Sequence, residues 1–184
     1  MKKQNTVLYI LRLSLTLLII TALAAAGLAG VNAVTKDKIA ENKLIKTQKA
    51  LAEVLPGAEG MTKTGEGSGI VQAVYTPAAG SAVQGWAVQV APTSGFGGEI
   101  VLMVGINADK TVEGISVVSH GETPGLGAVA AAKTPAGERF RDSFLGKSGS
   151  VAVTDIDAIS GATITSKAVA EGVSAALAYL ETLG

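Results

Sequence analysis

The segment from Leu13 to Thr35 carries no charged side chain and consists largely of Leu, Ile, Ala and Val. As an α-helix it would span about 34 Å, enough to cross the roughly 30 Å hydrocarbon core of a bilayer. We therefore expect a transmembrane helix over residues 13–35, preceded by an N-terminal tail over residues 1–12. A cleaved signal peptide is the alternative, because Ala24–Ala26 resembles a small-residue cleavage site. However, the apolar run outlasts the roughly 7–15 residues typical of such peptides.

The charged residues on either side of this segment bear on its orientation. Lys2, Lys3 and Arg12 precede it, which fits a cytoplasmic N-terminus. Three more lysines follow within residues 36–43, so the charge pattern favours this orientation only weakly. The expected topology is a single pass.

Residues 36–56 continue with helix-forming side chains until Pro56 and Gly57 end the pattern. We expect a helical stalk over this range. Its apolar residues have mixed helical spacing, which leaves two alternatives open. The stalk either docks onto the domain that follows or stands in solvent.

The remaining part, residues 57–184, holds all but two of the chain's 23 glycines and is therefore rich in turns. An apolar period of 3.6 residues predicts a helix over residues 165–183, and Pro135 suits the first turn of a shorter helix over Pro135–Leu145. The predicted strands are Ile70–Thr76, Gly85–Ala91, Ile100–Asn107, Val112–Ser119 and Val151–Thr154, with a hairpin turn at residues 108–110. The expected fold class is α+β with a mostly antiparallel sheet.

The composition excludes several kinds of chemistry. Because the chain has no cysteine, it has no disulfide, no cysteine-ligated zinc or iron–sulfur site and no thiol nucleophile. Its single histidine disfavours a multi-histidine centre, so we expect no metal site. Residues 57–184 carry seven basic and twelve acidic side chains without a basic run, which argues against nucleic acid as a partner. Any redox chemistry must therefore come from a bound cofactor.

Conventional catalytic patterns are weak, and we expect no catalytic residue. Asp155 and Asp157 alternate on an expected strand, so we expect one to form an inward hydrogen bond and the other to be solvated. A Ser/His/Asp triad that uses His120 is not indicated, because no serine lies in a Gly-x-Ser-x-Gly nucleophile motif. Gly95–Gly98 is glycine-rich but leads into a strand, so it lacks the context of a nucleotide-binding loop.

One segment with a more informative pattern is Asp157–Ser166, which reads D-A-I-S-G-A-T-I-T-S and enters the C-terminal helix. The unpaired N–H groups and positive dipole end of a helix N-terminus suit a phosphate. Gly161 and Ala162 leave room for a ligand close to the backbone. Simple helix capping by the hydroxyl groups is the alternative.

A second such segment is His120–Gly127, which reads H-G-E-T-P-G-L-G and ends a strand. Its glycines and its proline predict a fixed loop that a ligand can approach closely, with three polar side chains. For this segment taken alone, a purely structural turn is the alternative.

Together the two segments resemble the FMN-binding domain of the Rnf and sodium-pumping NADH:quinone oxidoreductase complexes, and most closely that of the RnfG subunits of Rnf electron-transport complexes. The resemblance extends over nearly the whole chain. It includes the anchor, the stalk, the Gly95–Ile100 stretch, the His120–Gly127 loop and the D-x-x-S-G-A-T motif at residues 157–163. It implies one FMN, attached covalently through its phosphate to the hydroxyl of Thr163 by a separate flavin transferase.

The same resemblance implies the surroundings of the cofactor. The phosphate would lie at the helix N-terminus, where the N–H groups of Thr165 and Ser166 can bind it. The expected cofactor-binding residues are Thr163 as the carrier, then Ser160, Gly161, Ala162, Thr165 and Ser166, with His120, Glu122, Thr123, Leu126 and Gly127 near the ring.

The function implied by the resemblance is a membrane-anchored electron-transfer subunit of an ion-translocating ferredoxin:NAD oxidoreductase, incomplete as an enzyme by itself. The expected partners are the other membrane and redox subunits of the Rnf complex, the flavin transferase and the lipid bilayer. The expected location is the cell (inner) membrane, with residues 57–184 as an extracytoplasmic FMN-binding domain. Two alternatives remain: the equivalent subunit of the sodium-pumping quinone reductase, and a non-redox membrane-tethered binding module.

Overall fold

A computed structural model describes residues 2–58, 60–79, 81 and 83–183. The chain divides into two compact units, Met1–Ile45 and Lys46–Gly184. Helix α1 (Lys2–Val54) makes up the first unit and contributes its last turns to the second. Residues 2–12, expected as a tail, are therefore helical, and the stalk helix ends at Val54 and not at residue 56.

The apolar part of α1 meets the requirements of a helix in lipid. Its large side chains between Val7 and Val34 are exposed, and none of its most apolar stretch is buried. The hydroxyls of Thr16, Thr21 and Thr35 donate to carbonyls four residues earlier in the same helix, at 2.7, 2.9 and 2.8 Å. These three hydroxyls are thus satisfied within the helix, as suits a bilayer. In the part of the chain that the structure describes, this is the one helix long and apolar enough to cross a membrane.

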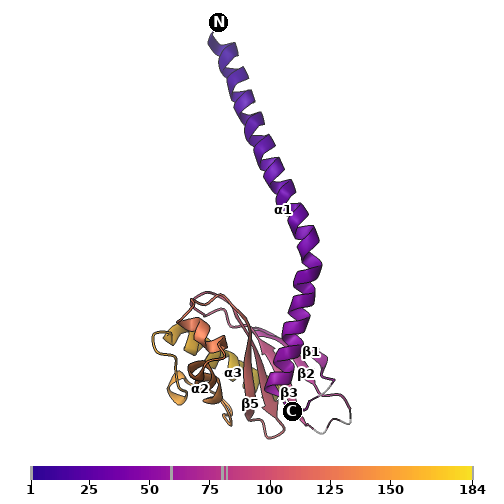
Figure 1. Cartoon of the computed structure of the whole chain (residues 1–184), viewed down its shortest axis with the longest axis vertical. Coiled ribbons are helices and arrows are strands. Elements are labelled where there is room, and N and C mark those ends of the chain that lie inside the picture. Colours follow the sequence, from indigo (N-terminus) through magenta and orange to yellow (C-terminus); the bar gives the residue numbers. More distant parts are fainter. Residues whose placement is uncertain (1, 59, 80, 82, 184) are drawn as a thin grey trace. The chain divides into compact units, whose positions relative to one another are not determined.

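The second unit is built on a five-stranded antiparallel sheet in which neighbours in sequence are neighbours in space (Figure 1). Its strands are β1 (Thr62–Glu66), β2 (Val71–Thr76), β3 (Gly85–Val90), β4 (Ile100–Asn107) and β5 (Val112–His120). The predicted turn at residues 108–110 joins β4 to β5, and Lys110 takes a positive φ of 60° there. The α+β class is confirmed.

One face of the sheet packs against α3 (Thr163–Leu183), as the apolar period predicted. Alternate residues of β4 point toward this helix because successive side chains of a strand face opposite sides. The buried core on this face includes Ile100, Leu102, Val104, Ile106, Val169, Val173, Ala176, Leu177 and Leu180.

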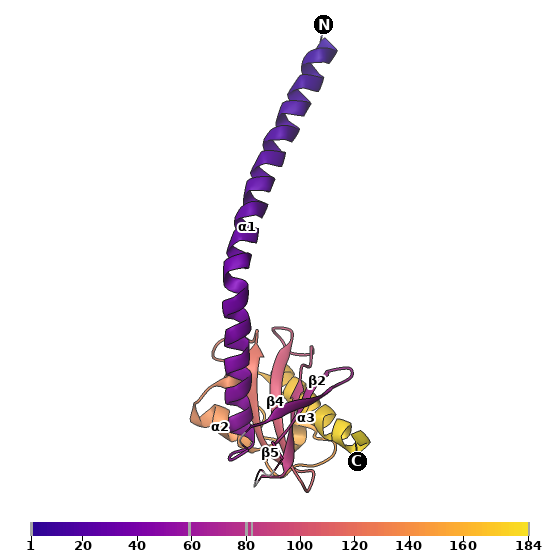
Figure 2. The same cartoon turned by 90° about the vertical axis from the view of Figure 1, so that its right-hand side faces the viewer.

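The opposite face of the sheet carries the last turns of α1 (Figure 2). Leu51 and Val54 pack there with Met103 of β4. A glycine pair across β4 and β5, Gly105 and Gly114, makes room for this helix end, because a side chain at Gly105 would overlap the Val54 carbonyl. The end of the stalk is thus docked onto its domain and not solvated.

One predicted strand is wrong, and one predicted helix is shorter than expected. Val151–Thr154 is not a strand: the Val151 N–H donates to the Ser174 hydroxyl of α3 at 2.9 Å, and a 3₁₀ turn η2 (Val153–Asp155) follows. The helix expected over Pro135–Leu145 is α2 (Pro135–Asp142), capped by Thr134. Strand β1 was not predicted at all.

Candidate functional site

The two segments singled out in the sequence meet at a pocket of about 290 Å³. The loop after β5 and the 3₁₀ turn η1 (Gly127–Ala131) form one side, and the start of α3 forms the other. The lining residues are Phe96, Glu122, Thr123, Leu126, Gly127, Gly161, Ala162, Thr163, Ile164 and Thr165. Eight of these belong to the predicted set, so residues far apart in sequence share one concave surface.

The start of α3 places Thr163 and Thr165 in opposite environments. Thr163 is the first residue of the helix and is exposed, so its hydroxyl is accessible from the pocket. Thr165 is 1% exposed, and its hydroxyl donates to the Glu122 carboxylate at 2.5 Å. The N–H groups of the first helical turn lack intrahelical acceptors and give this end a partial positive charge. Thr163 is thus the accessible hydroxyl at an anion-favouring position.

Glu122 connects three separate parts of the pocket. It is 6% exposed, and its Oε1 accepts from the Gly97 N–H at 2.9 Å while its Oε2 accepts from Thr165. Gly127 is glycine of necessity, since a Cβ there would overlap both the Glu122 carboxylate and the Thr165 hydroxyl. Among the described lining residues none is basic, so this carboxylate is the charged group of the pocket.

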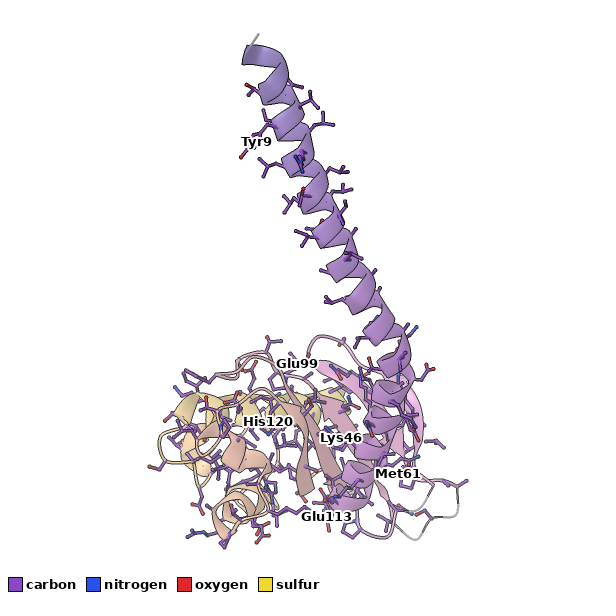
Figure 3. The ribbon with its side chains drawn as sticks, turned by 45° about the horizontal axis from the view of Figure 1, so that its top comes forward. Tyr9, Lys46, Met61, Glu99, Glu113 and His120 are labelled. Atoms are coloured by element: carbon purple, nitrogen blue, oxygen red, sulfur yellow. The ribbon has the colours of Figure 1, made fainter. Side chains whose placement is uncertain are left out.

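Three predicted residues do not line the pocket. His120 ends β5 (Figure 3), half-buried, and its Nδ1 accepts the Glu122 N–H at 3.2 Å, so the imidazole shapes the loop. Ser160 lines a neighbouring hollow instead. Ser166 is fully buried, and its hydroxyl forms two hydrogen bonds to the backbone. It accepts from the Ile159 N–H and donates to the Ala162 carbonyl.

The backbone N–H of Ser166 was expected to bind the phosphate, but it has another partner. This N–H donates to the Ala162 carbonyl at 3.0 Å and so is not available to a phosphate. The expectation for the aspartates is wrong as well, because Asp155 and Asp157 are both exposed. Asp155 accepts from the Ala152 N–H at 2.9 Å within its own turn.

Phe96 and Ile164 line the pocket but were not predicted from the sequence. They are 70% and 51% exposed, which is unusual for large apolar side chains. The sequence signal for Phe96 was its place in the Gly95–Ile100 stretch of the family resemblance. Leu126 is 46% exposed beside them, so the rim of the pocket is apolar.

A second hollow, of about 480 Å³, lies beside the docked end of α1 and is lined by residues of both charges, including Lys46 and Glu113 (Figure 3). Glu53 accepts there from the Ser116 hydroxyl at 2.8 Å and from Lys133 at 3.1 Å. Partial burial acts to raise the pKa of Glu53, but these two hydrogen bonds and the charges of Lys133 and Lys49 outweigh it. The pKa of Glu53 is therefore lowered from its ordinary value.

Comparison with known proteins first defines the class of the second unit. The FMN-binding domain family matches residues 95–178, a range that contains every residue lining the pocket. The RnfG N-terminal region matches residues 1–54, a range that contains the whole of α1.

Relatives extend this similarity over the whole chain. The G subunit of the Na⁺-translocating ferredoxin:NAD⁺ oxidoreductase complex of Acetobacterium woodii is 34% identical over 95% of this chain and 93% of its own length. The G subunit of an ion-translocating oxidoreductase complex of Methanosarcina acetivorans is 31% identical over 93% of this chain and 94% of its own. The G subunit of an ion-translocating oxidoreductase complex of Aliivibrio fischeri strain MJ11 is 30% identical over 88% of this chain and 86% of its own length. The chain therefore belongs to the RnfG family of ion-translocating oxidoreductase complexes, and the resemblance drawn from its motifs is confirmed.

Proposed function

We propose that this chain is the FMN-carrying electron-transfer subunit of an ion-translocating ferredoxin:NAD oxidoreductase complex. The observation that carries the proposal is the pocket, because an exposed threonine at a helix N-terminus and a fixed loop form it inside the FMN-binding family match. As one subunit of such a complex, the chain is part of an oxidoreductase and not a complete enzyme.

The phosphate end of FMN fits the start of α3. We propose that the FMN phosphate forms an ester with the Thr163 hydroxyl, made by a flavin transferase outside this chain. Thr163 is exposed, and the partial positive charge of the helix N-terminus favours a phosphate beside it. Thr165 is a poor acceptor because its hydroxyl is buried and bonded to Glu122. A covalent ester would retain the cofactor without taking part in electron transfer.

The ring end of FMN fits the other side of the pocket. Phe96, Leu126 and Ile164 offer apolar surface, and Glu122 and Thr123 offer a few polar groups, which is the usual balance of a cofactor site. Bound there, the isoalloxazine supplies the electron-accepting chemistry, and the protein holds and orients it. Its electrons would come from and pass to cofactors of neighbouring subunits.

The position of the subunit follows from α1. The exposed apolar helix supports anchoring in a bilayer. We propose a single pass through the cell membrane with residues 57–184 on the extracytoplasmic side, supported by Lys2, Lys3 and Arg12 before the span. On that side a covalent bond prevents loss of the flavin to the surroundings.

Denaturing electrophoresis under ultraviolet light tests the proposal. The full chain, produced in cells that contain the flavin transferase, should give a fluorescent band. A dark band from those cells contradicts covalent flavin and favours the non-redox binding module. Subunits that co-purify with the native chain in mild detergent then distinguish a ferredoxin:NAD complex from a quinone reductase. The name of the Acetobacterium woodii relative supports the former.

A further inference from the structure

We propose that Glu122 is a positioning residue of the flavin pocket, which fixes the ring side of the pocket relative to the attachment threonine through hydrogen bonds and not through its charge. This inference rests on the proposed function for its cofactor. The hydrogen-bond arrangement itself is a property of the chain alone.

Glu122 and the two groups that it binds come from three separate segments. Gly97 follows Phe96 in the loop before β4, Glu122 lies in the loop after β5, and Thr165 lies in the first turn of α3. Each segment also contributes directly to the pocket wall, through Phe96, Leu126 and Thr163 in turn. One carboxylate therefore determines how these walls are spaced.

The burial of Glu122 makes this role energetically significant. A carboxylate that is 6% exposed must be satisfied by hydrogen bonds, because an unsatisfied buried polar group costs stability. Both of its oxygens accept, one from the Gly97 N–H and one from the Thr165 hydroxyl. Among the described residues no basic side chain forms an ion pair with it, so its partners are the neutral donors of the pocket walls.

The Glu122 side chain is long enough to accept hydrogen bonds from both the Gly97 N–H and the Thr165 hydroxyl. Gln has the same length, so its amide oxygen can accept from the Gly97 N–H and its amide nitrogen can donate to the Thr165 oxygen. Asp keeps the charge but is shorter by one methylene and cannot reach both groups. Comparison of the two variants separates reach from charge.

The two hydrogen bonds that Glu122 accepts, from Gly97 and Thr165, are called the Glu122 clamp below. Hydrogen exchange tests this clamp in a chain without flavin. In the full chain carrying Thr163→Ala, mass spectrometry follows deuterium uptake in peptides that contain Gly97. Glu122→Ala and Glu122→Asp should accelerate exchange of this segment by about 10- to 100-fold, as expected for loss of a hydrogen bond to a charged acceptor. Glu122→Gln should stay close to the parent. Equal uptake in all four chains would overturn the clamp.

Visible circular dichroism of the attached flavin tests the consequence for the pocket. Glu122→Ala and Glu122→Asp should lose most of the induced flavin signal, and Glu122→Gln should retain it. Thr165→Val removes the other donor while preserving shape, and should also weaken the signal, with Thr165→Ser as its matched control. In each variant the melting of the sheet, followed by far-ultraviolet circular dichroism, shows that the second unit remains folded.

The outcomes distinguish the clamp from the cofactor assignment. If the wild-type chain carries no flavin, the proposed function fails. The exchange experiment still shows whether Glu122 holds the Gly97 segment. If flavin is attached and the Ala, Asp and Gln variants all keep the wild-type signal, Glu122 does not position the ring and the inference is wrong. An intact signal in Asp with a lost signal in Gln would also overturn it, because charge and not reach would then be decisive.

Discussion

Thr163 and Thr165 lie two residues apart in one helical turn, yet they differ in every property that decides whether a hydroxyl can carry a ligand. Thr163 is exposed at the pocket, whereas Thr165 is buried and donates to Glu122. A helix advances by about 100° per residue, so two residues along the chain point to nearly opposite sides. The sequence places both threonines at the start of the helix, and the fold gives them opposite environments.

Gly127→Val should disrupt the pocket from within. Any side chain at this position overlaps the Glu122 carboxylate and the Thr165 hydroxyl, so the loop must move away from α3. We expect less attached flavin per chain and a shifted flavin absorption spectrum, both measured on the purified full chain. Gly65→Ala is the control, because Gly65 lies in β1 with its nearest neighbour 4.0 Å from an added Cβ. A Gly127→Val chain with wild-type flavin content and spectrum would show that the loop is only a turn.

The roles of single residues could not be predicted where they depend on contacts between residues distant in sequence. The motif residues could be named in advance because their chemistry is local. The bond between Glu122 and Thr165 joins residues 43 positions apart, and nothing in either motif specifies it. His120 was expected near the ring, yet its Nδ1 accepts the N–H of Glu122, and so it serves the loop instead.

At the scale of elements, β4 packs against α3 in the larger buried core of the second unit. Leu102 is fully buried there, and Leu102→Ala should cost about 2–5 kcal/mol of unfolding free energy through the cavity it leaves. Leu145→Ala is the matched control: this leucine is 47% exposed, and its loss should change the free energy by about 0.5 kcal/mol or less. Trp86, the chain's single tryptophan, packs against the same core and reports denaturant unfolding by fluorescence. Equal costs for the two variants would contradict this packing.

The docked end of α1 should make stability depend on pH through Glu53. Folding lowers the pKa of Glu53, so its contribution is present above its ordinary pKa and is lost as the pH falls through the lower folded value. Because the side chain of Glu53 is 40% exposed, we expect a contribution no larger than about 1 kcal/mol. Denaturant unfolding at neutral and acid pH should show Glu53→Gln losing less stability on acidification than the wild type. A larger loss in Glu53→Gln would reverse the sign and exclude this account.

The elements that could be predicted are those with a strong local period. The face of α3 follows directly from the spacing of its apolar residues, and β3, β4 and β5 follow from short, mostly apolar runs between turns. β1 was missed because its sequence, Thr-Lys-Thr-Gly-Glu, is polar and mostly exposed, so this edge strand is defined by its pairing with β2 and not by an apolar period. Val151 was expected in a strand because it is apolar, but a side-chain hydroxyl of α3 takes its backbone hydrogen bonds instead.

At the scale of the whole molecule, the chain combines a unit suited to lipid with a unit suited to water. We predict that residues 57–184 lie outside the cytoplasm and remain attached to the membrane. Protease added to intact spheroplasts should digest this part, while in sealed inverted vesicles it should be protected. Digestion only in inverted vesicles would reverse the orientation, and a mature N-terminus near Ala26 would replace the anchor by a cleaved signal peptide.

The central claim is that the chain carries FMN on Thr163, and peptide mass mapping of the full chain tests it most directly. In cells with the flavin transferase, the peptide that contains residues 157–167 should gain the mass of one FMN less one water, with fragmentation placing it on Thr163. Thr163→Ala should abolish the modification while costing about 1 kcal/mol or less in stability, and Thr165→Ala should retain it on Thr163. Flavin that persists in Thr163→Ala, or that maps to Thr165 in the wild type, would contradict the account.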